Sequence, residues 1–426
     1  MNAAKPNWHV CIVTPGQIGS NPRVVKEATA LHDAGLRVTV IATRVLDGVE
    51  RRDQSILREV PFKIERIDLR SRTRWRLRRI GQMAARAVHA MNGGNLLAET
   101  AFSVFTPPLI SAATRIPADL YIAHYPPALP AASAAARRFR SHYAFDAEDF
   151  HLGEWPAEPE FEKERSRLRR LEGSVLKGCS YITAASPGIA QAYAQAYGLA
   201  QPNVVLNTFP LAQAPDGPTP RGSASPGPSL YWFSQVVGPN RGLECAIGAI
   251  AYARTRPHLY LRGYVSPDYA RHLRALADRK SVLGRLHFLP TALPSQMERL
   301  AAVYDLGLCA EPAHTASNAR VLSNKLFSYL LAGLPVLMSD TPAQRAFALD
   351  NPCAAFLFAN GNAENLAAAL DMVLSDGARL AQARNHAFGI ARETYNWDRE
   401  SRIFVDLVRH SLQNAASEQD QAGYAT

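Results

Sequence analysis

The chain has few cysteines, and they are not placed as a disulfide framework or a zinc site requires. No CxxC pair and no Cys/His cluster occurs in the 426 residues. The five cysteines are Cys11, Cys179, Cys245, Cys309 and Cys353. An odd, scattered set argues against both a disulfide scaffold and a zinc module, so we expect a reducing environment and no metal ion.

Long hydrophobic runs are also missing. The early apolar run Val10–Val13 is too short for a signal peptide. The longest apolar stretch, Leu326–Met338, is interrupted by Gly333 and Pro335 and cannot span about 30 Å of hydrocarbon. We therefore expect a cytoplasmic protein, at most peripheral on the inner face of a membrane.

Positive charge is plentiful. The formal net charge is +10, while 47% of the residues are hydrophobic and 20% are charged. This composition is typical of a folded globular chain, and its charge predicts an anionic partner. The length fits two domains of about 200 residues each.

The beginning of the chain predicts a βαβ unit. A buried strand at His9–Thr14 precedes a helix that Asn21 can cap and that Pro22 can begin. Gly35 ends this helix, and Val38–Ala42 forms the next strand.

The same alternation continues, and it predicts an α/β fold with two doubly wound parallel sheets. Further strands are expected at Leu120–Ala123, Tyr143–Phe145, Tyr181–Ala184, Asn203–Leu206, Leu230–Phe233, Leu259–Arg262, Leu286–Leu289, Leu306–Cys309, Pro335–Met338 and Ala354–Phe358.

The predicted domains are residues 1–210, a Pro/Gly/Ser-rich linker at 211–229, residues 230–395, and a C-terminal helix with a polar tail at 396–426. We expect the two domains to face a cleft. The last helix, Asp398–Gln413, is expected to cross back over the first domain through a face formed by Ile403, Leu407 and His410.

Two loops follow predicted strands and suit phosphate binding, because helix N-termini at strand ends offer free N–H groups. The first contains Gly16 and Gly19, whose small size lets a ligand approach the backbone; the alternative is a plain turn. The second begins at Gly238 and contains Arg241. Together with Lys325, which opens a later helix, Arg241 could neutralise a leaving diphosphate, although a solvated helix-start lysine is the simpler alternative.

Four segments resemble the family 4 group of GT-B glycosyltransferases. They are Ser20–Glu27 (SNPRVVKE), Phe145–His151 (FDAEDFH), Tyr231–Gln235 with Gly238–Leu243, and Ser323–Val336 (SNKLFSYLLAGLPV). The resemblance covers nearly the whole chain. It implies the GT-B fold, a nucleotide sugar held mainly by the C-terminal domain, an acceptor held by the N-terminal domain, and transfer with retention.

The resemblance also implies roles for individual residues. It assigns diphosphate contacts to Arg241 and Lys325 and a place near the transferred sugar to His124, which by itself could equally be a structural hydrogen bonder. The donor side further includes Ser323, Asn324 and Ser328.

One departure from the family pattern concerns two glutamates spaced eight positions apart. Arg320 and Ser328 occupy those positions here, so the usual sugar and ribose contacts do not carry over. Glu311 is a candidate substitute that could reach sugar hydroxyls, with a solvent-facing loop glutamate as the alternative.

An acidic group follows a strand of the first domain and is expected on the acceptor side. Paired carboxylates there could orient an acceptor hydroxyl or take its proton, or could instead cap a helix and pair with Arg165 or Arg169. The candidates are Asp146, Glu148, Asp149 and His151, with Glu154 nearby.

The stretch from Arg70 to Arg86 predicts a basic amphipathic helix. Leu77, Ile80, Ala84 and Val88 share one face, which favours contact with anionic lipid over a merely solvated face. The candidate membrane patch is Arg72, Arg74, Arg76, Arg78 and Arg79. No aromatic platform accompanies the charge, so nucleic acid is not the expected partner.

We therefore expect a hexosyltransferase that moves a sugar from a nucleoside diphosphate to a polysaccharide or lipid-linked acceptor. Its only co-substrate is the sugar nucleotide, with no further cofactor. A dinucleotide oxidoreductase is disfavoured because the first loop lacks GxGxxG. The remaining alternative is a sugar-nucleotide-binding or scaffold protein that lost its chemistry together with the two glutamates.

Overall fold

The computed structural model describes residues 7–92, 98–218 and 225–423. The chain divides into two compact units: residues 1–205 together with 401–426, and residues 206–400. Part of the expected linker, residues 219–224, lies outside the described residues. The second unit's first strand begins at Ser229, one residue earlier than predicted.

The first unit contains a parallel sheet, described with seven strands in the order β3-β2-β1-β4-β5-β6-β7. The strands are β1 (His9–Val13), β2 (Arg37–Arg44), β3 (Lys63–Asp68), β4 (Leu120–His124), β5 (His142–Ala147), β6 (Ile182–Ala184) and β7 (Asn203–Val204). The strand order reverses between β1 and β4, and ligands of such sheets bind at the carboxyl ends of the strands around that point.

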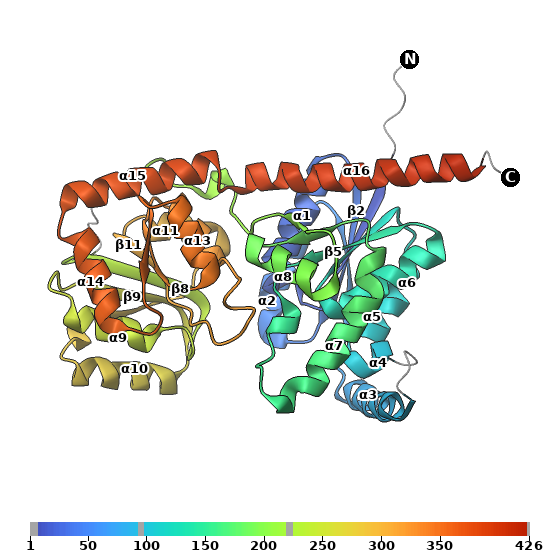
Figure 1. Cartoon of the computed structure of the whole chain (residues 1–426), viewed down its shortest axis with the longest axis horizontal. Coiled ribbons are helices and arrows are strands. Elements are labelled where there is room, and N and C mark those ends of the chain that lie inside the picture. Colours follow the sequence, from blue (N-terminus) through green and yellow to red (C-terminus); the bar gives the residue numbers. More distant parts are fainter. Residues whose placement is uncertain (1–6, 93–97, 219–224, 424–426) are drawn as a thin grey trace, which may run out of the picture. The chain divides into compact units, whose positions relative to one another are not determined.

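Helices cover the faces of this sheet (Figure 1). They are α1 (Pro22–Asp33), α2 (Glu50–Glu59), α3 (Arg72–Asn92), α4 (Ala98–Phe102), α5 (Thr106–Ala113), α6 (Leu129–Phe139), α7 (Glu162–Val175) and α8 (Pro187–Tyr197). As predicted, Asn21 caps α1 by accepting a hydrogen bond from the Val24 N–H. Helix α2 and strand β3 were not predicted, because β3 is a mostly polar edge strand without a buried run.

The second unit repeats this architecture with a parallel sheet in the order β10-β9-β8-β11-β12-β13. Its strands are β8 (Ser229–Val237), β9 (His258–Val265), β10 (Leu286–Leu289), β11 (Leu306–Cys309), β12 (Val336–Ser339) and β13 (Ala355–Phe358). Its helices are α9 (Leu243–Tyr252), α10 (Pro267–Arg279), α11 (Met297–Ala301), α12 (Asn324–Leu331), α13 (Pro342–Asp350), α14 (Ala363–Leu374) and α15 (Gly377–Glu393). The prediction of two doubly wound parallel sheets is confirmed.

The core of the second unit lies on both faces of its sheet. One cluster joins α9 and α14 to β8 and β9 around Trp232 and Leu261. A second cluster packs α12 against the opposite face around Tyr231 and Phe327. Because side chains alternate along a strand, neighbouring residues of β8 contribute to different clusters. The sheet is therefore covered by packed helices on both faces.

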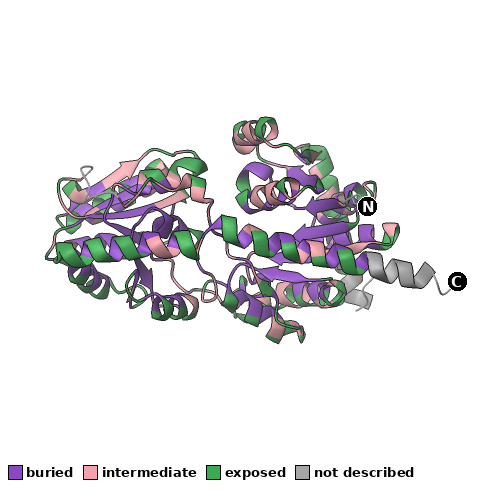
Figure 2. Cartoon of the chain, turned by 90° about the horizontal axis from the view of Figure 1, so that it is seen from above, coloured by how far each residue is buried: buried purple, intermediate pink, exposed green. Residues whose placement is uncertain are grey.

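The last helix, α16 (Trp397–Gly423), places residues from 401 onward with the first unit. Arg409 Nη2 donates a hydrogen bond of 2.9 Å to the carbonyl oxygen of Ala34. The predicted contact face was wrong, because Ile403 and His410 are exposed while Phe404 and Val408 are fully buried. The buried stripe is thus rotated by about one residue, about 100° on a helix. Figure 2 shows this alternation of buried and exposed residues along the helix.

Among the helices in the described part of the chain, none combines the length and apolarity that a membrane crossing requires. The five cysteines are free thiols, and Cys11 and Cys309 are buried in the two sheets. The structure thus agrees with a chain that is not held together by disulfides.

Candidate active site

Strands β8 and β11 are neighbours in the second sheet. Their carboxyl ends bring together the loop that contains Arg241 and the loop that contains Glu311. Gly242, at the end of the loop that follows β8, has φ +73°, and a Cβ atom there would lie 2.2 Å from the Ala310 carbonyl oxygen. Only glycine permits both this conformation and this approach. The Arg241 loop therefore rests directly against the residue that precedes Glu311.

Lys325 lies in the first turn of α12, close to the same place. Its ammonium group forms an ion pair with Glu311 and lies 5.6 Å from the centre of the Trp232 ring on β8. Ser323 Oγ is 3.4 Å from the same Nζ atom. Asn324, the first residue of α12, is exposed, and Lys325 itself is 7% exposed. The fold thus groups Lys325, Glu311 and Ser323 beside the Arg241 loop.

Arg241 differs from Lys325 because its charge is not neutralised by a carboxylate of the described residues. Its side chain is partly buried, and within residues 7–92, 98–218 and 225–423 its guanidinium has no hydrogen-bond or ion-pair partner. Gly238, which starts the loop, is buried. A half-buried, unpaired guanidinium at the carboxyl edge of a parallel sheet is suited to a phosphate group, which it can contact with two parallel N–H donors.

The two positions where the family carries glutamates are occupied differently. Ser328 is fully buried, and its Oγ donates a 2.7 Å hydrogen bond to Glu298 Oε1 of α11. Arg320 Nη1 donates to the Ala316 carbonyl oxygen at 2.6 Å. A carboxylate therefore stands beside Ser328, but it comes from another helix. Sequence reasoning missed Glu298 because nothing in its local pattern signals this contact.

The glycine loop of the first unit is filled by protein rather than open. The Gly19 N–H donates to Asp53 Oδ1 at 2.8 Å, and a Cβ on Gly19 would lie 2.7 Å from that oxygen. The Gly16 N–H donates to Thr14 Oγ1 at 3.1 Å. In this structure, the group that approaches the Gly19 backbone is therefore the Asp53 carboxylate.

His124 ends β4 at the reversal point of the first sheet and is fully buried. Its Nε2 is 2.8 Å from Glu27 Oε2, and its Nδ1 is 3.7 Å from Asp146 Oδ1. Arg23 donates to both Asp146 oxygens at 2.9 and 2.7 Å and lies 3.1 Å from Glu27. Thr183 donates to Asp146 at 2.6 Å. We call Arg23, Glu27, His124 and Asp146 the buried charge cluster.

The charges of this cluster balance when His124 is protonated. Burial lowers the pKa of His124, but the neighbouring Glu27 and Asp146 carboxylates outweigh it and raise the pKa. Burial raises the pKa of Asp146, but Arg23 outweighs this and lowers it. Burial raises the pKa of Glu27 as well, and the Asp146 carboxylate raises it further. One proton, held by His124 or by Glu27, brings the net charge of the four side chains to zero, which reduces the free energy required to bury them.

Glu27, His124 and Asp146 also lie close enough together to be considered as metal ligands, since one atom from each falls within 4.8 Å of the others. A cation is already present in the cluster, however, in the form of the Arg23 guanidinium. Asp146 accepts hydrogen bonds from Arg23 and Thr183, so protein donors surround its oxygens.

The remaining acidic residues lie just after β5. Tyr125, a non-glycine residue at φ 65°, donates to Glu148 at 2.9 Å, and His151 Nδ1 is 2.8 Å from Glu154. Burial raises the pKa of Asp149 to about 6. Strained backbone and shifted pKa values concentrate at functional sites. The alternative in which this acidic group pairs with Arg165 was wrong, because Arg165 pairs with Glu162.

Comparisons with known proteins agree with this geometry. Residues 18–208 match the family described as "Glycosyl transferase 4-like domain". The chain carries a glycosyl transferase 4-like domain. No curated protein matches the sequence.

Solved structures extend the likeness to both units. HepE of Anabaena, crystallised with UDP and glucose, is 16% identical with a TM-score of 0.70, over 95% of this chain and 100% of that one. Sucrose-phosphate synthase of Thermosynechococcus elongatus is 13% identical with a TM-score of 0.69, over 95% and 98%. TarM of S. aureus is 8% identical with a TM-score of 0.66, over 94% and 99%. These likenesses establish the GT-B fold, so the prediction of this fold is confirmed. The family match over residues 18–208 agrees with the predicted resemblance to family 4 glycosyltransferases.

The sequence predicts the candidate donor-side residues but not the side chains that surround them. Trp232, which lies under Lys325, was quoted only as part of a strand motif. Arg23 and Glu27 were quoted only as part of the family resemblance, although their i, i+4 spacing places them on one face of a helix. That spacing was the available signal for a buried ion pair.

Proposed function

We propose that this glycosyltransferase moves a hexose from a nucleoside diphosphate to a hydroxyl of a glycan or lipid-linked acceptor, with retention at the anomeric carbon. The observation that carries the proposal is the Arg241 guanidinium, which has no partner among the described residues and whose loop lies beside the Lys325–Glu311 pair. Retention follows from the family resemblance. HepE was crystallised with UDP and glucose, so a uridine diphosphate sugar is the first donor to test.

On the donor side, Arg241 and Lys325 stabilise the diphosphate as it leaves. Charge develops on the leaving oxygen as the sugar–oxygen bond breaks, and fixed cations lower the energy of that state. Glu311 holds the Lys325 ammonium in place while neutralising part of its charge, which leaves Arg241 as the stronger diphosphate contact. In this proposal side chains neutralise the diphosphate, and the sugar nucleotide is the only small molecule required besides the acceptor.

On the acceptor side, Asp149 is the candidate base. A carboxyl group with a pKa of about 6 is ionised for most of the time at neutral pH yet basic enough to take a proton from a hydroxyl. Glu148, which accepts from Tyr125, is the candidate for orienting that hydroxyl. The buried charge cluster holds the strand ends from which these residues extend.

Helix α3 supports an acceptor at a membrane surface. Leu77, Ile80 and Met83 are 63%, 62% and 66% exposed. Four exposed arginines flank them, namely Arg72, Arg74, Arg76 and Arg79, while Arg78 is partly buried. Exposed apolar side chains framed by arginines are complementary to anionic lipid, with roughly 1 kcal/mol contributed per arginine near the surface.

Co-sedimentation of the full chain with anionic phospholipid vesicles tests this surface. We expect binding that falls at high salt and falls further in the Leu77→Asp/Ile80→Asp double variant. Leu349→Asp is the matched control, because Leu349 is 73% exposed on α13, in the other unit. Equal binding by the α3 variant and wild type would remove the membrane from the proposal.

The catalytic proposal is tested with purified protein and a panel of sugar nucleotides. A donor that binds should raise the unfolding temperature by mass action. Release of nucleoside diphosphate from that donor, faster when a glycan acceptor is added, supports transfer. Binding without release favours the second candidate, a scaffold protein, which the absence of acidic side chains at Arg320 and Ser328 supports.

A further inference from the structure

A cavity of about 570 Å³ lies in the second unit, at the sheet edge opposite the candidate donor site. Its lining comes from three stretches that lead into β8, β9 and β10. The lining residues are Pro226, Gly227, Pro228, Thr255, Arg256, His258 (the first residue of β9), Ser281, Val282, Gly284 and Arg285. Arg241, Glu311 and Lys325 all follow strands instead. A strand of eight residues such as β9 separates the two edges by roughly 25 Å at about 3.3 Å per residue.

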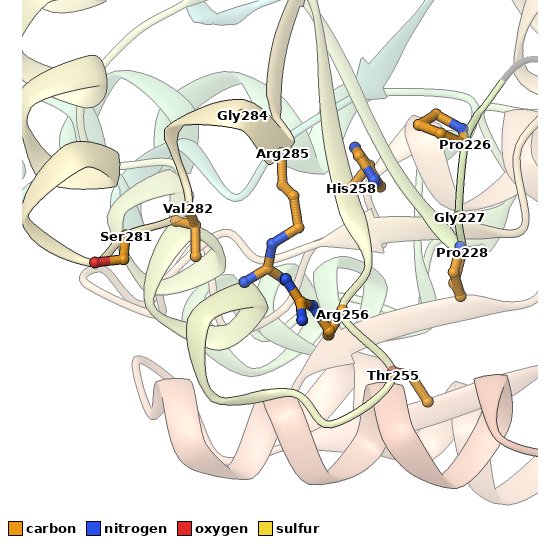
Figure 3. Close-up of a pocket in the computed structure, with 10 residues that line it drawn as sticks. All are labelled: Pro226, Gly227, Pro228, Thr255, Arg256, His258, Ser281, Val282, Gly284 and Arg285. Carbon is orange, nitrogen blue, oxygen red and sulfur yellow. The ribbon is translucent and has the colours of Figure 1, made fainter.

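Two guanidinium groups converge in this cavity. Figure 3 shows the side chains of Arg256 and Arg285 pointing toward one another from different loops. Burial lowers the pKa of Arg285, and the positive charge of Arg256 lowers it further. Arg285 is held in place because its Nη1 donates to the Ile250 carbonyl oxygen at 2.5 Å. The two like charges are therefore kept close by the fold.

The backbone of Arg256 adopts an unfavourable conformation in this cavity. Its φ of 50° is left-handed, a region that disfavours residues with a Cβ. In the part of the chain that the structure describes, its guanidinium has no hydrogen-bond or ion-pair partner. The carboxylate that contacts the lining, Asp371, is engaged by the N–H and hydroxyl of Thr255 and by Arg254. A strained backbone that carries a charged side chain without an ion-pair partner is typical of a ligand-binding residue.

Two histidines lie next to the two guanidinium groups. His258 lines the cavity, and its Nδ1 is 2.9 Å from Nε2 of His287. Burial lowers the pKa of His258, and His287 and Arg285 lower it further, so the pair is mainly uncharged at neutral pH. A bound anion would reverse this effect, because an opposite charge favours the imidazolium form.

We infer that this cavity is a second anion site, which binds a small phosphorylated molecule through Arg256 and Arg285. Paired guanidinium groups match the geometry of phosphate oxygens better than any neutral ligand. The site does not depend on the donor proposal, because its residues lie at the other edge of the sheet.

Titration calorimetry of the full chain with pyrophosphate tests the inference. The Arg241→Ala/Lys325→Ala double variant removes the candidate donor contacts and should keep one pyrophosphate site. Adding Arg256→Gly to it should weaken that site at least tenfold. Arg254→Ala is the matched control, because the Arg254 side chain is 90% exposed and does not line the cavity.

Arg256→Gly also separates a loss of binding from a loss of folding. Glycine accepts the left-handed conformation without strain, so the variant should unfold at the same or a higher temperature than wild type while losing the pyrophosphate-induced rise. Loss of binding with intact stability supports the site. Unchanged affinity in Arg256→Gly, or loss of all pyrophosphate binding in the Arg241→Ala/Lys325→Ala variant, would overturn it. Neither of those two results depends on whether sugar transfer is detected.

Discussion

The two sheets present charged residues at their carboxyl edges in opposite ways. In the first unit, Arg23, Glu27, His124 and Asp146 are all buried and form ion pairs with one another. In the second unit, Lys325 is paired with Glu311, whereas Arg241 has no partner within the described residues. In the first unit the charged residues therefore stabilise the fold, whereas in the second unit Arg241 can bind an anion.

This difference separates stability from binding. A neutral, buried set of ions contributes mainly to holding strand ends in register, and it is expensive to disrupt because a lone charge is left without water. An unpaired cation near the surface contributes little to stability but can gain a full interaction with an incoming anion. Substitutions in the two regions should therefore affect different measurements.

The largest expected effect is on stability in the first unit. Arg23→Met leaves Asp146 and Glu27 buried without their cation, and should lower the free energy of unfolding by about 3–5 kcal/mol. Chemical denaturation measures this change. The control is Arg70→Met, since Arg70 pairs with Asp68 at the surface and should leave the midpoint nearly unchanged. Similar midpoints for both variants would mean that the cluster is not structural.

The second effect concerns the close backbone approach in the second unit. Gly242→Ala adds a Cβ at 2.2 Å from the Ala310 carbonyl oxygen, so it should shift the Arg241 loop and weaken donor binding. Gly361 is the matched control, because its φ of +72° is nearly the same but no atom lies within 4 Å of an added Cβ. Gly361→Ala should lower the free energy of unfolding by about 1–2 kcal/mol, because only the left-handed backbone conformation is unfavourable for alanine. Gly242→Ala should lower it clearly more, because the added Cβ also clashes with Ala310. Equal losses in the two variants would contradict the packing described for the loop.

The third and smallest effect is a pH dependence of the stability of the first unit. The pKa of His124 is raised in the fold by Glu27 and Asp146, so its contribution to stability is fully present below about pH 6.5 and is lost as the pH rises through the folded value. Glu27→Gln removes the nearer carboxylate and should flatten this decline above pH 6.5. Unfolding free energies measured across that range, with the exposed Glu59→Gln as control, test it. The pKa of Glu27 is raised too, so parallel profiles for wild type and Glu27→Gln would exclude the Glu27–His124 pair as the titrating unit.

Much of the fold followed from local patterns, because apolar runs and caps act over a few residues. The Asn21 cap, the Pro22 helix start and the strands on either side of them were predicted correctly. Strand β3 was missed because polar residues dominate an edge strand. The face of α16 was misjudged because its partner surface comes from residues hundreds of positions away, such as Ala34.

The candidate site was predictable only in part, for the same reason. Sequence motifs placed Arg241 and Lys325 after strands, but the Lys325–Glu311 pair and the Glu298–Ser328 hydrogen bond depend on helices that meet in space. His124 and Asp146 were predicted as separate sites, and the structure joins them through Arg23 and Glu27. Charge pairing across a sheet has no local signature, so these contacts required the structure.

The most direct test is titration calorimetry of uridine diphosphate, or of the nucleoside diphosphate that most stabilises the wild type, against Arg241→Ala. A guanidinium that contacts the diphosphate contributes about 1.5–3 kcal/mol, so affinity should fall roughly tenfold or more while the unfolding midpoint stays at the wild-type value. Arg254→Ala should bind like wild type. Undiminished affinity in Arg241→Ala would contradict the account, because the unpaired cation at the carboxyl edge of the second sheet would then not be the one that holds the donor.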